Sequence, residues 1–156
     1  MTGLYNRMGY QKLSISYFTI MREKKMPVLV MFIDLDRLKY INDTFGHEYG
    51  DFAIVSIAKA MLKHCDADAI AARTGGDEFI VLEGAKDEES GRVLAQKIRT
   101  ELSKTQRAMQ LPFDLGASIG AVVAHPGEEN VLESYVKRAE MLMYEEKAEK
   151  KVSRDS

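Results

Sequence analysis

Residues 28–36 of the chain are Val28-Leu29-Val30-Met31-Phe32-Ile33-Asp34-Leu35-Asp36. Six consecutive apolar residues, several of them β-branched or aromatic, predict a strand that is buried on both faces. Two aspartates follow where this strand is expected to end. Carboxylates at such a strand end are well placed to hold Mg²⁺, which prefers oxygen ligands and is often shared with substrate phosphates.

The two aspartates need not have the same role. Asp34 and Asp36 lie on the same side of the strand if its geometry continues through both residues. Either could instead cap the helix that we expect to begin at Leu38. We expect Asp36 to cap or brace the structure, and Asp34 to be the metal ligand.

The elements on either side of this strand follow from apolar periodicity and from turn residues. Asn6 predicts the cap of a helix that runs to about Lys24. After the strand, the pattern predicts helices over 38–45 and 50–63, strands over 69–73 and 79–82, a helix over 88–104, a strand region over 113–124 and a helix over 131–150. This order predicts an α/β domain in which helices pack on a mixed sheet.

A second acidic motif, Gly75-Gly76-Asp77-Glu78, lies in the predicted turn between two short strands. Glycine pairs supply the positive φ angles that tight hairpins need, so a plain turn with solvated acids is one interpretation. If the hairpin pairs beside the strand 28–33, however, Asp77 and Glu78 converge on Asp34, and their mutual repulsion calls for a cation. Adjacent strand residues face opposite sides, so Asp77 and Glu78 need not do the same job.

Residues 39–51 are more polar than a core helix would be. Asn42 offers a donor and an acceptor and Asp51 offers acceptors, which together suit a guanine base. Each alone would more often be a cap or turn residue. The backbone amides after Asp36, where Leu38 starts a helix, could cradle a phosphate.

Composition excludes several classes of protein. The chain has 156 residues, 46% hydrophobic and 29% charged, typical of one globular domain. The net charge of −2 provides no basic field for nucleic acid, and no apolar run is long enough to span a membrane. Cys65, the only cysteine, excludes an internal disulfide and is compatible with the cytosol.

Taken in order, the motifs resemble those of the GGDEF diguanylate cyclase family. The matching segments run through nearly the whole chain, and their order and spacing are more specific than any single match. They are Thr2-Gly3-Leu4-Tyr5-Asn6-Arg7, Phe32-Ile33-Asp34-Leu35-Asp36, Asn42-Asp43-Thr44-Phe45-Gly46-His47 with Gly50-Asp51, Arg73-Thr74-Gly75-Gly76-Asp77-Glu78-Phe79, and Ser118-Ile119-Gly120.

The resemblance implies a fold and an activity. The expected fold is an α+β sandwich with a mixed, mostly antiparallel sheet of about five strands, the ferredoxin-like palm core of nucleotidyl cyclases. The expected reaction joins two GTP molecules into cyclic di-GMP and releases two pyrophosphates. Each GTP sits on its own domain, so a second copy of the domain is needed, in a transient antiparallel dimer.

The resemblance also implies roles for individual residues. Asp34, Asp77 and the Leu35 carbonyl would be magnesium ligands, and Glu78 would support a second ion, with Mn²⁺ as a substitute. Two such ions lie about 3.5–4 Å apart in two-metal sites. Asp77 would also accept the proton of the ribose 3′-hydroxyl. The expected substrate-binding residues are Asn42 and Asp51 for guanine and Lys39 and Lys147 for phosphate, together with His47, Leu38 and Lys151.

The chain departs from the family pattern in two places. Lys150 and Lys151 stand where the family usually has Gly-Arg, and a lysine cannot form the bidentate fork of an arginine. Asp66-Ala67-Asp68-Ala69 stands where product-inhibited members carry Arg-x-x-Asp. We expect these acids to repel a cyclic dinucleotide.

Two other classes of function remain as alternatives. One is a catalytically silent GTP-binding or signalling module of the same fold. The other is a polymerase palm, which shares the two-carboxylate logic but needs a basic groove that this composition does not suggest. We expect one domain over residues 1–156, cut from a longer regulated protein with an upstream sensor domain. We expect it in the cytoplasm, without contacts to nucleic acid or membrane, whether or not the parent protein has a membrane anchor.

Overall fold

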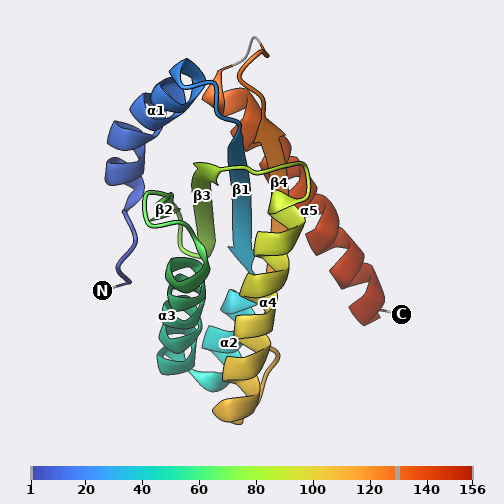
Figure 1. Cartoon of the computed structure of the whole chain (residues 1–156). Helices are drawn as coiled ribbons and strands as arrows, with labels where there is room; N and C mark the ends of the chain where they lie inside the picture. Colours follow the sequence, from blue (N-terminus) through green and yellow to red (C-terminus); the bar gives the residue numbers. More distant parts are fainter. Residues whose placement is uncertain (1, 129–130, 156) are drawn as a thin grey trace.

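The computed structural model describes residues 2–128 and 131–155 and is centred on one buried strand (Figure 1). The domain predicted over residues 1–156 therefore includes four residues, 1, 129, 130 and 156, that lie outside the described part. The elements are, in order, α1 (Arg7–Glu23), β1 (Val28–Leu35), α2 (Leu38–Phe45), α3 (His47–His64), β2 (Ile70–Arg73), β3 (Glu78–Gly84), α4 (Ser90–Ala108), β4 (Ala117–Ala124) and α5 (Leu132–Asp155).

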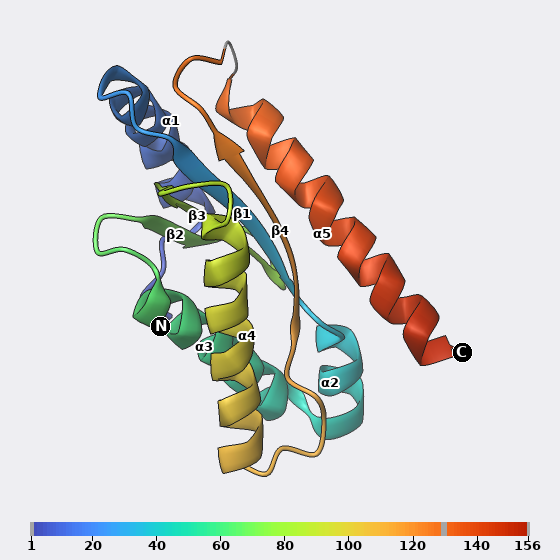
Figure 2. The same cartoon turned by 45° about the vertical axis from the view of Figure 1, so that its right-hand side comes forward.

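Strand β1 is buried along all eight residues, as its apolar run predicts. Its side chains alternate between two cores. Leu29, Met31, Ile33 and Leu35 enter the core that α3 and α4 cover, while Val28, Val30 and Phe32 enter the core that α1 and α5 cover. Figure 2 shows α4 and α5 on opposite sides of β1 and β4. This three-layer arrangement confirms the α+β sandwich.

The sheet has the order β2-β3-β1-β4, with every neighbouring pair antiparallel. The prediction of a mixed sheet of about five strands is therefore slightly wrong for the described residues. The parallel component is reduced to an isolated bridge between Tyr5 and Ala72. It cannot lengthen into a strand because Asn6 caps α1 in the next position, where its side chain accepts the Gly9 N–H at 2.8 Å.

Several element boundaries differ from the predicted ones, among them the start of β4 and the end of α5. The strand region predicted over 113–124 begins at Ala117, because Phe113 instead packs against Phe45 and Tyr49 of the α2–α3 pair. Helix α5 continues to Asp155, past the predicted end near Lys150. None of the described helices is long and apolar enough to cross a membrane.

Candidate active site

Three carboxylates meet where β1 ends and the β2–β3 hairpin turns. Antiparallel pairing places Asp34 opposite Glu78, and Asp77 precedes Glu78 in the turn. Asp34, Asp77 and Glu78 each contribute an oxygen to a cluster within 4.8 Å. The convergence expected from the two motifs is observed. Because Asp77 and Glu78 are half-buried, they are not the fully solvated acids of a plain turn.

The hairpin is held by its own polar groups. The Thr74 N–H donates to the Glu78 carbonyl at 3.0 Å, which closes the turn. The Arg73 guanidinium donates to the Gly76 carbonyl at 2.8 Å. These bonds fix the backbone that carries the two acids, so their approach to β1 does not depend on a ligand.

Burial and neighbouring charges raise the proton affinity of Asp34 and Glu78. Asp34 is only 3% exposed, and burial together with the charge of Asp77 raises its pKa to about 6. Burial and the charges of Asp77 and Glu140 also raise the pKa of Glu78. Lys147 of α5 partly compensates, since its ammonium donates to Asp34 Oδ2 at 3.1 Å.

The other oxygen of Asp34 has no such compensation. Asp34 Oδ1 is buried and has no hydrogen-bond partner in the part of the chain that the structure describes. A buried carboxylate oxygen without a partner is costly, and a cation would satisfy it. Three clustered carboxylates and one orphaned oxygen fit a hard divalent cation such as Mg²⁺, which takes oxygen ligands.

The backbone adds a further oxygen on the same side. The Leu35 N–H donates to the Asp77 carbonyl at 2.8 Å, toward β3, and the Asp36 N–H donates to the Gly116 carbonyl at 2.9 Å, toward β4. The described peptide bonds are trans, so the Leu35 carbonyl points opposite to the Asp36 N–H. It therefore faces the β3 side, where the hairpin acids lie.

Asp36, in contrast, has partners for both carboxylate oxygens. Oδ1 accepts the Ser118 hydroxyl at 2.7 Å, and Oδ2 accepts the Lys150 ammonium at 2.7 Å. It does not cap α2, whose N-cap position is Arg37 and which has no side-chain cap bond. Of the two roles left open for Asp36, the structure therefore shows a brace.

The residues expected to contact guanine gather at the start of α3. A methyl group added at Gly50 would lie 1.7 Å from Asn42 Oδ1, so the Asn42 side chain lies directly over the first turn of α3. Asp51 follows Gly50 and is exposed, as is His47 at the beginning of the helix. The three polar side chains thus flank one exposed helix start.

The other residues expected to bind the substrate are less closely grouped. Lys147 contacts the acid cluster directly. Lys39 is 94% exposed and lies 3.9 Å from Asp43, while Lys151 is exposed on α5. Leu38 is the half-buried first residue of α2. The structure brings Lys147 to the acids and leaves Lys39 and Lys151 extended along the surface.

Sequence reasoning did not anticipate the charged network behind Asp36. Besides Asp36, Lys150 approaches Glu146 Oε1 at 3.4 Å, and Arg99 of α4 donates to both oxygens of Glu146 at 2.7 and 2.6 Å. The i, i+4 spacing of Glu146 and Lys150 was the available signal.

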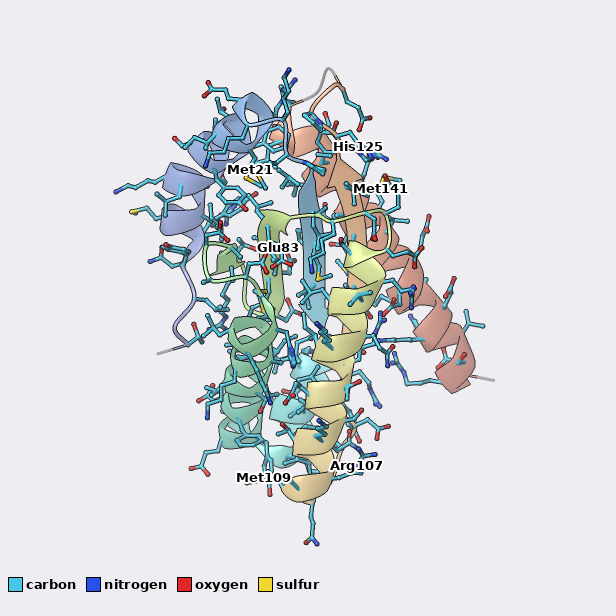
Figure 3. The ribbon with its side chains drawn as sticks, in the orientation of Figure 1. Met21, Glu83, Arg107, Met109, His125 and Met141 are labelled. Atoms are coloured by element: carbon cyan, nitrogen blue, oxygen red, sulfur yellow. The ribbon has the colours of Figure 1, made fainter. Side chains whose placement is uncertain are left out.

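The Asp66 segment, where product-inhibited relatives would carry arginine, is negatively charged in the folded domain. Glu83 on β3, labelled in Figure 3, is 8% exposed and accepts the Asp66 N–H at 2.9 Å. Burial, followed by the charges of Glu83 and Asp66, raises the pKa of the Cys65 thiol to about 12. A field of this sign disfavours a bound anion.

Comparison with known proteins agrees with this site. The family model described as diguanylate cyclase, GGDEF domain, matches residues 1–153. Diguanylate cyclase VdcA of Vibrio cholerae is 33% identical over 94% of this chain. The chain covers 43% of that relative's length.

Solved structures give the same result. The GGDEF domain of YfiN (TpbB) from Pseudomonas aeruginosa superposes with a TM-score of 0.80 at 28% identity, covering 96% of this chain and 93% of that one. The GGDEF domain of DgcB from Caulobacter crescentus, in complex with c-di-GMP, gives a TM-score of 0.78 at 27% identity, covering 94% and 87%. The chain therefore belongs to the GGDEF domain family of diguanylate cyclases.

Proposed function

We propose that this chain is an active catalytic domain that condenses two GTP molecules into cyclic di-GMP. In each half-reaction the 3′-oxygen of one GTP bonds to the α-phosphorus of the other, and the bond to pyrophosphate breaks. Two such steps release two pyrophosphates and close the ring. The observation that carries the proposal is the acid cluster of Asp34, Asp77 and Glu78 with its orphaned Asp34 oxygen.

The proposed metal site uses these acids and the backbone. Asp34, Asp77 and the Leu35 carbonyl would hold one Mg²⁺, and Glu78 would support a second, with Mn²⁺ able to replace either. Bound Mg²⁺ would supply Lewis-acid stabilisation of the charge on the attacking and leaving oxygens. Asp77 would take the 3′-hydroxyl proton, since a carboxylate in the ionised form is an acceptor.

The substrate would extend from the acid cluster toward α3. Asn42 and Asp51 would bind the guanine edges, with His47 beside them at the helix start. Helix α2 begins without a side-chain cap, so its first amides, from Leu38 onward, are free to donate to phosphate. Lys39, Lys147 and Lys151 would add positive charge around the triphosphate.

The partners follow from this reaction. GTP is the substrate, and a second copy of the domain must bring the second GTP in a transient antiparallel dimer. We also propose a cytoplasmic domain under the control of an upstream sensor, without contacts to nucleic acid or membrane. The single domain proposed for residues 1–156 would be the catalytic part of that larger protein.

One observation favours the alternative of a silent module. Lys150 and Lys151 replace the expected Gly-Arg, and Lys150 is engaged with Asp36 rather than available to a phosphate. If the remaining lysines bind the triphosphate too weakly, the domain would bind GTP without turning it over.

The two functions are separated by product analysis. The purified chain is incubated at high concentration with GTP and Mg²⁺, and the products are identified by mass spectrometry. Cyclic di-GMP and pyrophosphate in a ratio of about one to two are expected, with neither formed by Asp77→Asn. Bound but unchanged GTP, in a sample shown to be folded, would establish the silent module instead.

A further inference from the structure

Lys150 is placed where three oxygen atoms surround its ammonium group. Nζ donates to Asp36 Oδ2 at 2.7 Å and to the Ala117 carbonyl at 2.6 Å, and lies 3.4 Å from Glu146 Oε1. An ammonium has three hydrogens to donate, so this surrounding can use its whole capacity. Lys150 lies within α5, which runs to Asp155, and its side chain reaches from this helix to the start of β4 and the residue after β1.

Two of these oxygens flank the peptide that presents the Leu35 carbonyl. Ala117 of β4 is the register partner of Leu35, and Asp36 follows Leu35 directly. Lys150 therefore joins the start of β4 to the residue after the end of β1. The orientation of the Leu35–Asp36 peptide depends on keeping these two strand ends in register.

Glu146, which contacts the Lys150 ammonium, is itself held by hydrogen bonds. Arg99 of α4 donates two hydrogen bonds to Glu146, at 2.7 and 2.6 Å, and the Ile119 N–H donates to the same carboxylate at 3.3 Å. Both bonds of Arg99 come from one guanidinium nitrogen, Nη2, and hydrogen bonds between charged groups are shorter and stronger than neutral ones. Glu146 is thereby held beside Lys150, and the network connects α4 through α5 to the end of β1.

We infer that Lys150 is a positioning residue of the metal site. The contacts of its ammonium with the described residues are to Asp36, Ala117 and Glu146, not to the acid cluster. Lys150 acts through Asp36 and the Ala117 carbonyl, which hold the Leu35 carbonyl on the side of Asp34 and Asp77. The inference rests on the proposed function, since it presupposes that the acid cluster binds a divalent cation. A glycine, the residue usual at this position in the family, has no side chain to form this brace.

Two roles for Lys150 predict opposite changes in metal affinity. If Lys150 acted only as a nearby positive charge, its removal would lower repulsion and tighten the binding of a cation. If Lys150 positions the Leu35 carbonyl, its removal allows this ligand to move out of place and weakens the binding of the cation. Mutation of residues that hold metal ligands in position typically changes metal affinity by about 10–100-fold.

The experiment measures Mn²⁺ binding directly, from the paramagnetic resonance signal of the free ion, on the whole chain without nucleotide. Two neutral variants are used, Lys150→Met and Lys150→Gln, so that the test can still be made if one of them does not fold. The control is Lys137→Met, which removes the same charge from an exposed i, i+4 pair with Glu133 on the same helix. We expect a Kd for Mn²⁺ at least about tenfold higher in either Lys150 variant and unchanged in Lys137→Met.

Thermal melting of the metal-free proteins separates positioning from general stability. A purely structural role would lower the Tm and leave the Mn²⁺ affinity of the folded protein unchanged. In the Asp36→Asn background, Lys150→Met should change the Kd by a smaller factor than in the unsubstituted chain, because both changes interrupt the same brace. Unchanged or tighter Mn²⁺ binding in the folded Lys150 variants would overturn the inference, as would full additivity with Asp36→Asn.

Asp34→Asn serves as the reference for the site itself. If Asp34→Asn loses Mn²⁺ binding while the Lys150 variants keep it, only the role of Lys150 is wrong. If Asp34→Asn binds Mn²⁺ as the unsubstituted chain does, the metal site of the proposed function is wrong as well.

Discussion

At the scale of single residues, the two aspartates at the end of β1 differ in what surrounds their oxygens. Asp36 has a hydrogen-bond donor for each oxygen, whereas Asp34 has one donor and one buried oxygen that no described residue pairs with. Both oxygens of Asp36 are therefore satisfied without a ligand. Those of Asp34 are not, and this difference is what distinguishes a brace from a candidate ligand.

Asp34→Asn should remove activity without destabilising the metal-free domain. The raised pKa of Asp34 means that its charge is unfavourable in the fold, so a neutral isostere should leave the metal-free Tm unchanged or higher. Turnover should fall at least about a hundredfold, because metal stabilisation of the transition state contributes several kcal/mol. Melting with and without Mg²⁺ completes the test: Mg²⁺ should raise the Tm of the unsubstituted chain only. Substantial activity in the folded variant would contradict the assigned site.

Asp51→Ser should reduce the discrimination between GTP and ATP. A carboxylate accepts from guanine N1–H and N2–H₂, whereas adenine has no hydrogen at N1 and would place a lone pair against the charge. The ratio of kcat/KM for GTP to that for ATP should fall about tenfold or more. Glu48→Ser, an exposed change on the same helix turn, is the control and should leave the ratio unchanged. Equal use of both nucleotides by the unsubstituted chain would refute the role of Asp51.

At the scale of elements, Gly50 is kept in α3 at some cost to the helix. Glycine in a helix interior is about 0.5–1 kcal/mol less favourable than alanine, yet a methyl group here would overlap Asn42 Oδ1. Gly50→Ala should therefore displace the Asn42 side chain, leave the Tm unchanged or higher, and raise the KM for GTP about tenfold. Asn42→Ala should raise the KM similarly, and the double variant no further. A KM unchanged by Gly50→Ala would show that Asn42 does not bind the substrate in this position.

The charge of Glu83 on β3 lowers the stability of the fold by an amount that depends on pH. Burial raises its pKa, so the folded state favours the protonated form. A pKa that is higher in the folded than in the unfolded state contributes to the stability of the fold at low pH. This contribution is complete below the unfolded pKa of about 4.3 and is lost as the pH rises through the folded pKa. Glu83→Gln should therefore gain in Tm over the unsubstituted chain between pH 4 and pH 7.5. A difference in Tm that is constant across this range would show that the Glu83 charge carries no such cost.

Local patterns explain which elements could be predicted from the sequence. The run at residues 28–33 and the glycine pair of the hairpin determine their own structure, so β1, the turn and the meeting of Asp34 with Glu78 were predicted. The start of β4 was not, because Phe113 is apolar for packing on α2 and α3 rather than for strand pairing. Lys150 bonds to Asp36, just after β1, and to Ala117 of β4, both more than 30 residues away in the chain. Of its contacts only the one with Glu146 has a local signal, the i, i+4 spacing.

At the scale of the whole molecule, the described part of each domain carries one cluster of three carboxylates, while the proposed reaction consumes two nucleotides. Exposed large apolar residues occur on several of the described elements, among them α1, α3, α4 and α5. Met109 at the end of α4 and Met141 on α5, 57% and 64% exposed, lie in separate parts of the molecule (Figure 3). We therefore expect a mainly monomeric chain in dilute solution, in which two domains meet only transiently.

The most direct test of this account is the rate of cyclic di-GMP formation per domain, measured across a series of protein concentrations at saturating GTP and Mg²⁺. Encounter of two domains predicts that specific activity rises with protein concentration, and that a coiled coil fused before Thr2 raises it further by increasing the effective concentration. Light scattering on the same samples establishes whether they are monomeric. Specific activity that stays flat down to the lowest measurable concentration, in a monomeric sample, would contradict a two-domain diguanylate cyclase.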